Sequence, residues 1–157
     1  MSNRRMADLS LAQELEVDPV DAMILLAGAD PSQQVMIAGH RHVELLAGLC
    51  RRGFSAAGCQ AVSGARVSRE AVDLLWIPAV ASEAEISAAL VQLGRNLRPG
   101  GMLVVGDERR VKSWSLPSWV AQHGFLATRQ VALSGGRGVL LAARKESLGD
   151  ARQRAAA

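Results

Sequence analysis

The sequence predicts a single α/β domain, built on a mostly parallel sheet with helices on both faces. Three observations predict this class. Short apolar runs alternate with amphipathic helical patterns, glycine or proline stands at most of their junctions, and the length of 157 residues suits one core. Alternation of buried strands with helices is typical of parallel sheets covered on both sides.

Composition and charge limit the classes of protein to which this chain can belong. Hydrophobic residues make up 49% and charged residues 21%, which is the balance of a globular protein. The N-terminus lacks the apolar core of a signal peptide and no apolar run reaches membrane-spanning length, so we expect a cytoplasmic protein without membrane association. The net charge of +3 favours anionic partners, whereas two phenylalanines and no tyrosine leave few platforms for stacking single-stranded nucleic acid.

The first helix is expected after Asp18, which suits an N-cap and precedes Pro19, a favoured first helical residue. Gly28 is expected to end this helix. Its apolar face would consist of Val20, Met23, Ile24 and Ala27. The expected domain plan has three parts: an N-terminal helical segment at 1–33 packed on the domain, an α/β domain at 34–145, and a disordered tail at 146–157.

A strand, a glycine turn and a helix follow. Residues 35–38 form a short apolar run that ends at Gly39, and a helical pattern comes next. The predicted inner face of this helix consists of Val43, Leu46, Ala47 and Cys50. Cys50 and Cys59 lack a C-x-x-C spacing, so we expect small core residues rather than a disulfide or a zinc site. Residues 54–59 form a weaker strand candidate.

Two buried strands are predicted on either side of the clearest helix. The run 72–77 is apolar and closed by Pro78. Ser82 and Glu85 have the spacing of a capping box and start a helix with the apolar residues Ile86, Leu90, Leu93 and Leu97. The proline and glycines that follow break this helix, and residues 102–105 form the next buried strand.

The C-terminal part is predicted to close the sheet with an antiparallel hairpin. Ser115 starts a short helix, and Trp114 and Trp119 have the spacing of a hydrophobic staple, which favours core packing over base stacking. Two apolar runs follow, 126–133 and 139–144. The SGGRG sequence between them suits a hairpin turn, so we expect these strands to be antiparallel.

Three segments resemble the class I S-adenosylmethionine-dependent methyltransferases. VMIAG at 35–39 resembles their first strand and glycine turn, VDLLW at 72–76 their fourth strand, and LRPGGMLVV at 97–105 the motif that leads into their fifth strand. The similarity spans residues 34–144. It implies a Rossmann-like, methyltransferase-type sheet and, if the family function is retained, S-adenosylmethionine as the cofactor.

The cofactor loop departs from the pattern of that family. An acidic residue normally lies two positions before the first glycine, where this chain has Ile37, and Arg41 and Val43 replace the next two glycines. Those glycines let the backbone approach the ligand, so both side chains are expected to crowd the methionine part of the pocket. Gln60 replaces the acidic residue that accepts from the ribose hydroxyls, and a neutral acceptor binds more weakly than a charged one. We therefore expect from the sequence that the chain binds no cofactor.

The resemblance still assigns four candidate cofactor contacts, which are Gly39, His40, Gln60 and Asp73. For Asp73 a second interpretation is open, in which it begins the strand or packs with a loop. Only residues 61–71 separate the second strand from the fourth-strand motif, too few for a helix and a third strand. The third-strand region is therefore predicted to be truncated, which leaves homodimerisation through an uncovered sheet edge open.

Basic residues follow several predicted strands at the edge where such sheets bind ligands. This anionic-ligand rim consists of His40, Arg41, His42, Arg66, Arg109 and Arg110, with Arg69 and Lys112 beside them. A phosphate, a nucleotide or a nucleic-acid backbone would suit the rim and the helix start behind it. The alternative is that these residues are solvated loop side chains.

The sequence predicts no metal site and assigns no catalytic residue. The pair His40 and His42, even with Cys59 or Asp107 as a third ligand, falls short of a four-ligand signature. The sequence has no nucleophile elbow, no Walker loop and no Cys-His pair with nucleophile spacing.

Three functions remain open from the sequence. The leading one is a methyltransferase-like pseudo-enzyme that acts as a binding or regulatory module for an anionic ligand or a protein partner. The second is a divergent but active methyltransferase. The third is a nucleotide-binding or nucleic-acid-binding protein that uses the basic rim.

Overall fold

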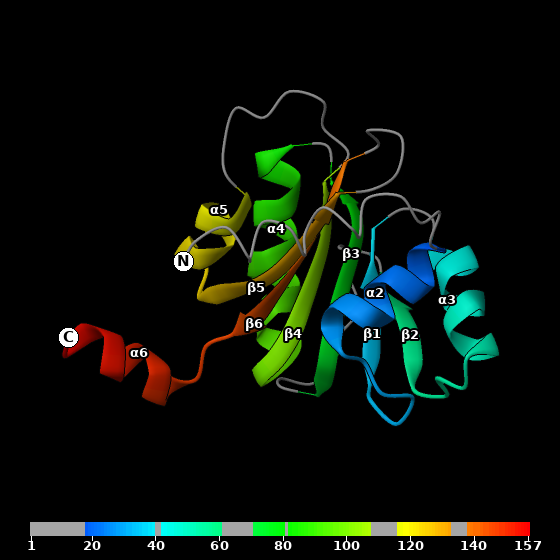
Figure 1. The fold of residues 1–157 in the computed structure, drawn as a ribbon, viewed down its shortest axis with the longest axis horizontal. Coiled ribbons are helices and arrows are strands. Elements are labelled where there is room, and N and C mark those ends of the chain that lie inside the picture. Colours follow the sequence, from blue (N-terminus) through cyan, green and yellow to red (C-terminus); the bar gives the residue numbers. More distant parts are fainter. Residues whose placement is uncertain (1–17, 40–41, 61–70, 81, 108–115, 133–137) are drawn as a thin grey trace, which may run out of the picture.

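A mixed six-stranded sheet forms the centre of the part of the chain that the computed structural model describes, which is residues 18–39, 42–60, 71–80, 82–107, 116–132 and 138–157 (Figure 1). The strands are β1 (Val35–Ala38), β2 (Ala57–Gln60), β3 (Val72–Val80), β4 (Leu97–Asp107), β5 (Phe125–Ala132) and β6 (Val139–Lys145). The helices are α2 (Pro19–Ala27), α3 (His42–Arg51), α4 (Glu83–Leu93), α5 (Leu116–Gln122) and α6 (Leu148–Ala155), with a 3-10 turn at Gly94–Asn96.

The strand order is β2-β1-β3-β4-β6-β5. The first four strands of this order run parallel, and β6 pairs antiparallel with both β4 and β5. This confirms the predicted α/β class, with a mostly parallel sheet and an antiparallel C-terminal pair. Parallel neighbours need crossover connections, and α3 and α4 supply two of them.

Helices cover both faces of the sheet, because successive residues of a strand point to opposite sides. In β1, Val35 and Ile37 join the core cluster under α2 and α3, whereas Met36 and Ala38 join the cluster under α4 and α5. Figure 1 shows the two helix pairs on opposite sides of the sheet. All four side chains are buried, which explains why this strand reads as a continuous apolar run.

The start and end of α2 agree with the sequence. The carboxylate of Asp18 accepts a hydrogen bond from the Val20 amide at 2.8 Å, and Gly28 ends the helix in the left-handed conformation at φ 61°. Val20 and Met23 are buried as predicted. The buried face continues through Leu26, whereas the predicted Ile24 and Ala27 are only partly buried.

The predicted inner face of α3 is wrong at three of its four residues, whereas Leu46 is partly buried against the core cluster under α2 and α3. Val43 is 69% exposed, and Ala47 and Cys50 are exposed as well, whereas Leu49 is fully buried. Gly48 is the physical reason. A Cβ on this glycine would lie 2.8 Å from Cγ2 of Val20, so α3 turns its smallest residue toward α2. The prediction that Cys50 is a core residue is therefore also wrong, and the side chain of Cys59 lies outside the described part of the structure.

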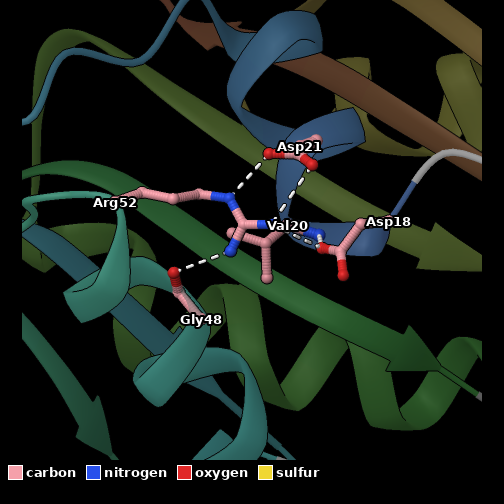
Figure 2. A network of polar contacts seen from close by, with 5 residues as sticks. All are labelled: Asp18, Val20, Asp21, Gly48 and Arg52. Atoms are coloured by element: carbon pink, nitrogen blue, oxygen red, sulfur yellow. Dashed lines mark hydrogen bonds and ion pairs between the residues drawn. The ribbon is translucent and has the colours of Figure 1, made fainter.

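Arg52, directly after α3, joins this helix to the first turn of α2 (Figure 2). Its Nε donates to Asp21 at 2.6 Å and its second terminal nitrogen reaches the other oxygen of the same carboxylate at 3.1 Å. The guanidinium also lies 3.3 Å from Asp18 and donates to the Gly48 carbonyl at 2.8 Å. The hydrogen bond from Arg52 lowers the pKa of Asp21 below its ordinary value.

The junctions around α4 differ from the sequence prediction. Ser82 caps the helix as expected and accepts from the Glu85 amide at 3.2 Å. The helix nevertheless ends at Leu93, and Leu97 is a buried residue of β4 rather than of the helix. Lys145 stabilises this early end, because its ammonium group donates to the carbonyls of Gly94 and Leu97 at 2.9 and 2.6 Å.

Strand β3 continues through Pro78 instead of ending there. Proline has no amide to donate, and the strand accommodates it where the pairing of β3 with β4 shifts register between Ile77 and Val80. At the same place Gly106 of β4 lies against the Pro78 carbonyl, where no side chain would fit. This close approach aligns the carboxyl ends of β3 and β4.

The C-terminal elements are partly as predicted. Trp119 of α5 is partly buried against the core and stacks on His123 with 4.2 Å between ring centroids, whereas Trp114 and Ser115 lie outside the described residues. The tail predicted as disordered instead contains α6. A reciprocal capping box between Ser147 and Asp150 starts this helix, which points away from the sheet in Figure 1.

Candidate functional site

The carboxyl ends of the four parallel strands define the candidate site. We call the ends of β1, β2, β3 and β4 the carboxyl edge, which lies at Ala38, Gln60, Val80 and Asp107. Open parallel sheets bind ligands outside this edge, near the point where strand order reverses. Here the reversal lies between β1 and β3, since β2 lies on one side of β1 and β3 on the other.

Gly39 makes the turn from β1 into α3 at this edge. Its φ of 96° is a conformation that side-chain-bearing residues rarely adopt, and a Cβ built there would have no atom within 4 Å. The backbone therefore keeps a glycine turn with open space beside it. His40 and Arg41, which follow, lie outside the described residues.

Ile37, at the position where the resemblance implies an acidic residue, belongs to the core. Its side chain is fully buried, and it lies in one apolar cluster with Val20, Leu49 and Trp76. A carboxylate at this position would have to leave water without a charged partner in that cluster. The packing of α2 and α3 on the sheet therefore requires an apolar side chain here.

Gln60 reaches the same edge as Gly39 through strand pairing. Its Cα pairs with that of Ala38 in the parallel ladder between β2 and β1. The structure thus brings together two of the four candidate cofactor contacts, Gly39 and Gln60, at the backbone level. The side chains of Gln60 and His42 lie outside what the structure describes.

Asp73 does not belong to this site, and its assignment as a cofactor contact is corrected. It lies at the amino end of β3, where its carboxylate accepts from the Gln34 amide at 2.8 Å and from Arg98 at 2.6 Å. Because β1 and β3 are parallel, the amino ends of these strands lie at the opposite edge from Gly39. The other interpretation holds: Asp73 begins the strand and ties it to its neighbours.

Asp107 is a buried carboxylate at the carboxyl end of β4. It is 5% exposed and pairs in register with Val80 of β3 and Val139 of β6. From the sequence it was considered only as a third metal ligand beside His40 and His42. The signal that marks it is its place at the end of the buried run 103–106 in β4. Within the described residues no group of three or more His, Cys, Asp or Glu side chains is placed to hold a metal ion.

Comparisons with solved structures identify the fold. An S-adenosylmethionine-dependent methyltransferase from Aquifex aeolicus matches with a TM-score of 0.61 and 13% identity, over 88% of this chain and 97% of the other. The 1,6-didemethyltoxoflavin-N1-methyltransferase of Burkholderia thailandensis, solved with S-adenosylhomocysteine, matches with a TM-score of 0.59 and 12% identity, over 93% and 84%. The chain has a methyltransferase-like fold.

The methyltransferase-like fold hosts more than one activity among these neighbours. The [4+2]-cyclase SpnF matches with a TM-score of 0.55 and 14% identity, over 81% of this chain and 79% of its own. No protein-family model matches this sequence, and no curated protein matches it either. Identities this low establish the fold alone, so function has to be argued from the site.

The predicted basic rim lies almost entirely outside the part of the chain that the structure describes. Arg41, Arg66, Arg109 and Arg110 all lie outside the described ranges, as does His40. The described residues that flank them are Gly39, Gln60 and Asp107, and these lie at one edge of the sheet. None of the described helices is long and apolar enough to cross a membrane.

Proposed function

We propose that this chain is a methyltransferase-like domain that has lost methyl transfer and acts as a binding or regulatory module. The observation that carries the proposal is Ile37. The position that is acidic in the family it resembles is here a fully buried residue of the core under α2 and α3. Because the packing requires an apolar side chain at this position, Ile37 cannot do what the acidic residue of the family does at the cofactor site.

Two further features of the same edge support the loss of cofactor binding. Val43 stands in the first turn of α3 at the place of a family glycine, so the start of this helix lacks the backbone freedom that glycine gives that family. Gln60 offers a neutral acceptor where the family has a carboxylate. Both changes weaken the grip on the methionine and ribose parts of S-adenosylmethionine.

Two kinds of ligand fit the proposal, which are an anionic molecule and a protein partner with an acidic surface. The flanking residues Gly39, Gln60 and Asp107 lie at the carboxyl edge, and the basic residues of the rim follow them in the sequence. The start of α3 adds free amide groups and a positive helix-dipole end on this side. A positive edge without a cofactor suits a phosphate-bearing ligand.

Calorimetry tests the loss of the cofactor site. S-adenosylmethionine and S-adenosylhomocysteine are titrated separately into the native chain at low salt, with a thermal-shift assay as a second readout. We expect no binding heat and no shift of the melting temperature. Micromolar binding of either compound would overturn the proposal and favour the second candidate, a divergent active methyltransferase.

The active alternative has two observations in its favour. Gly39 keeps the left-handed turn and open space that the family uses beside its ligand, and the Burkholderia neighbour holds S-adenosylhomocysteine in a related fold. If this alternative holds, Gly39→Val would abolish binding by closing the turn. If the chain binds no cofactor, this substitution would leave the calorimetric trace unchanged at zero.

The basic rim is tested separately by salt dependence. Binding of inorganic phosphate, a nucleotide or a short nucleic-acid duplex is measured between about 50 and 200 mM salt for the native chain and for Arg109→Ala with Arg110→Ala. A ligand held by the rim would lose affinity steeply with salt and again on substitution. Arg129→Ala on β5, an exposed arginine away from this edge, is the matched control and is expected to bind normally.

A further inference from the structure

The outer face of α3 carries apolar side chains that its own fold does not cover. We define this outer face as Val43, Glu44, Ala47, Cys50 and Arg51, all exposed. The helix packs inward through Gly48 and Leu49, which are buried, so the outer face points away from the sheet. The apolar members are spaced as one stripe on successive turns of the helix.

The exposure of this stripe is large. Val43 is 69% exposed, whereas a helix on a sheet normally turns such a stripe toward its core. The stripe lies on the flank of the molecule where α3 packs beside β2, the outermost strand at this end of the described sheet (Figure 1). An apolar stripe at a sheet flank is a surface suited to association.

Two charged residues lie beside the apolar stripe, and their spacing indicates which molecule binds to it. Glu44 lies in the first turn of α3 and Arg51 in its last turn, about 10 Å apart along the helix axis. That separation exceeds the i+3 and i+4 spacings at which side chains on one helix pair. Both nevertheless lie along one side of the same face, because seven residues are close to two full turns.

A second copy of α3 in antiparallel orientation satisfies both charges at once. With a two-fold axis near Ala47, Glu44 of one chain lies opposite Arg51 of the other, and the reverse pair forms by symmetry. Val43 then lies against Cys50 of the second copy. The small side chain of Ala47 at the crossing point allows the two helix axes to approach to about 8–10 Å.

We propose that the outer face of α3 is a self-association surface, on which two copies of this chain pair their α3 helices antiparallel. The observation that commits it to a second copy is this reciprocal charge arrangement, which is complementary to itself across a two-fold axis. The helix carries the interface rather than the edge of β2, because this strand has only four residues to offer for backbone pairing. The inference is independent of cofactor binding.

Sedimentation equilibrium over a wide concentration range tests the surface on the full chain. The native chain is expected to form a dimer, and Ala47→Glu to raise its dissociation constant at least tenfold by placing two carboxylates at the crossing point. Val91→Glu is the matched control, since Val91 is 71% exposed on α4 and lies on the other side of the sheet. This control is expected to dimerise like the native chain.

Charge exchange separates this geometry from a general apolar contact. Glu44→Arg alone and Arg51→Glu alone each set like charges against each other in both symmetric pairs, so each is expected to weaken the dimer. The double variant restores opposite charges and is expected to recover most of the native affinity. Circular dichroism on each variant confirms that the monomers remain folded.

Modification of the exposed Cys50 gives a second readout, because the proposed dimer covers it with Val43 of the second copy. Its maleimide reaction, followed by peptide mapping, is expected to slow as protein concentration rises. A chain that stays monomeric at high concentration would overturn the proposal. So would a dimer that Ala47→Glu leaves unchanged, or a double charge exchange that fails to recover affinity.

Discussion

Gly48 sets how closely α2 and α3 approach, and Arg52 fixes the two helices in that arrangement. A glycine at the contact lets Val20 pack directly against the α3 backbone. The arginine then binds Asp21 with two nitrogens and reaches Asp18 from the same guanidinium. These residues lie far apart in the sequence, so no local sequence pattern predicts their contacts. The buried side of α3 was predicted wrongly for this reason.

Adding one methyl group at this contact is expected to destabilise the protein. In Gly48→Ala the new Cβ would lie 2.8 Å from Val20, a stiff β-branched side chain that cannot turn away. The collision costs about 1–3 kcal/mol, whereas alanine gains about 1 kcal/mol of helix propensity, so we expect a net loss of about 1 kcal/mol. Urea denaturation measures it.

Gly58→Ala is the control for that substitution. A Cβ at this glycine meets no atom within 4 Å, so its free energy of unfolding is expected to stay within about 0.5 kcal/mol of the native value. If both alanine variants behaved alike, the close contact between α2 and α3 would not determine the packing of this layer.

Removal of the Arg52 guanidinium is expected to produce a pH-dependent loss of stability. Arg52 lowers the pKa of Asp21, so the pair stabilises the fold above the ordinary pKa of an aspartate, and the contribution is lost as pH falls through the lowered value. Arg52→Gln should therefore melt below the native chain at about pH 7, and the two melting temperatures should converge as pH falls through the lowered pKa of Asp21.

Thermal melts followed by circular dichroism across that pH range make the comparison. Arg95→Gln, at an exposed position outside the network, is the control and is expected to match the native chain throughout. A difference between native and Arg52→Gln that stays constant with pH would show that the arginine acts through packing rather than through its pair with Asp21.

At the scale of elements, local sequence signals predicted where most helices and strands start and missed where several of them end. The caps at Asp18 and Ser82 were read correctly because each is a side chain that bonds an amide two or three residues onward. The end of α4 was missed because Lys145, fifty residues away in sequence, binds the carbonyls that close it. The helix α6 was missed because its start depends on a short polar capping box rather than on an apolar face.

The cap of α4 provides a test at this scale. Ser82→Ala removes the acceptor for the Glu85 amide and is expected to lower the free energy of unfolding by about 1 kcal/mol. Ser82→Asp keeps an acceptor at the same place and is expected to restore stability. Equal stability of all three proteins in chemical denaturation would mean that the first turn of α4 does not depend on this cap.

At the scale of the whole molecule, the mostly parallel sheet with its antiparallel end was predictable and the fine structure of the site was not. Apolar runs that bury both faces of each strand, together with the family-like motifs, predict the parallel sheet and its antiparallel end, and the solved neighbours share that fold. The candidate contact Asp73 was misplaced because a motif gives a residue's strand without saying which end of the strand faces the ligand. The pairing of Asp73 with Gln34 and Arg98 settles this.

The central proposal is that this methyltransferase-like fold no longer has a working cofactor site. Ile37 is fully buried in the core, Val43 adds a side chain where the family has a glycine, and Gln60 removes a charge. Of these three, Val43 is exposed, so it can be changed without opening the core cluster around Ile37. This makes a gain-of-binding comparison feasible.

The most direct measurement is calorimetry of S-adenosylhomocysteine binding to the native chain beside a variant carrying Arg41→Gly, Val43→Gly and Gln60→Glu. The native chain is expected to show no binding heat, and the variant to gain measurable affinity as the backbone approach and the ribose acceptor are restored. Micromolar binding by the native chain, no weaker than that of the variant, would contradict the account.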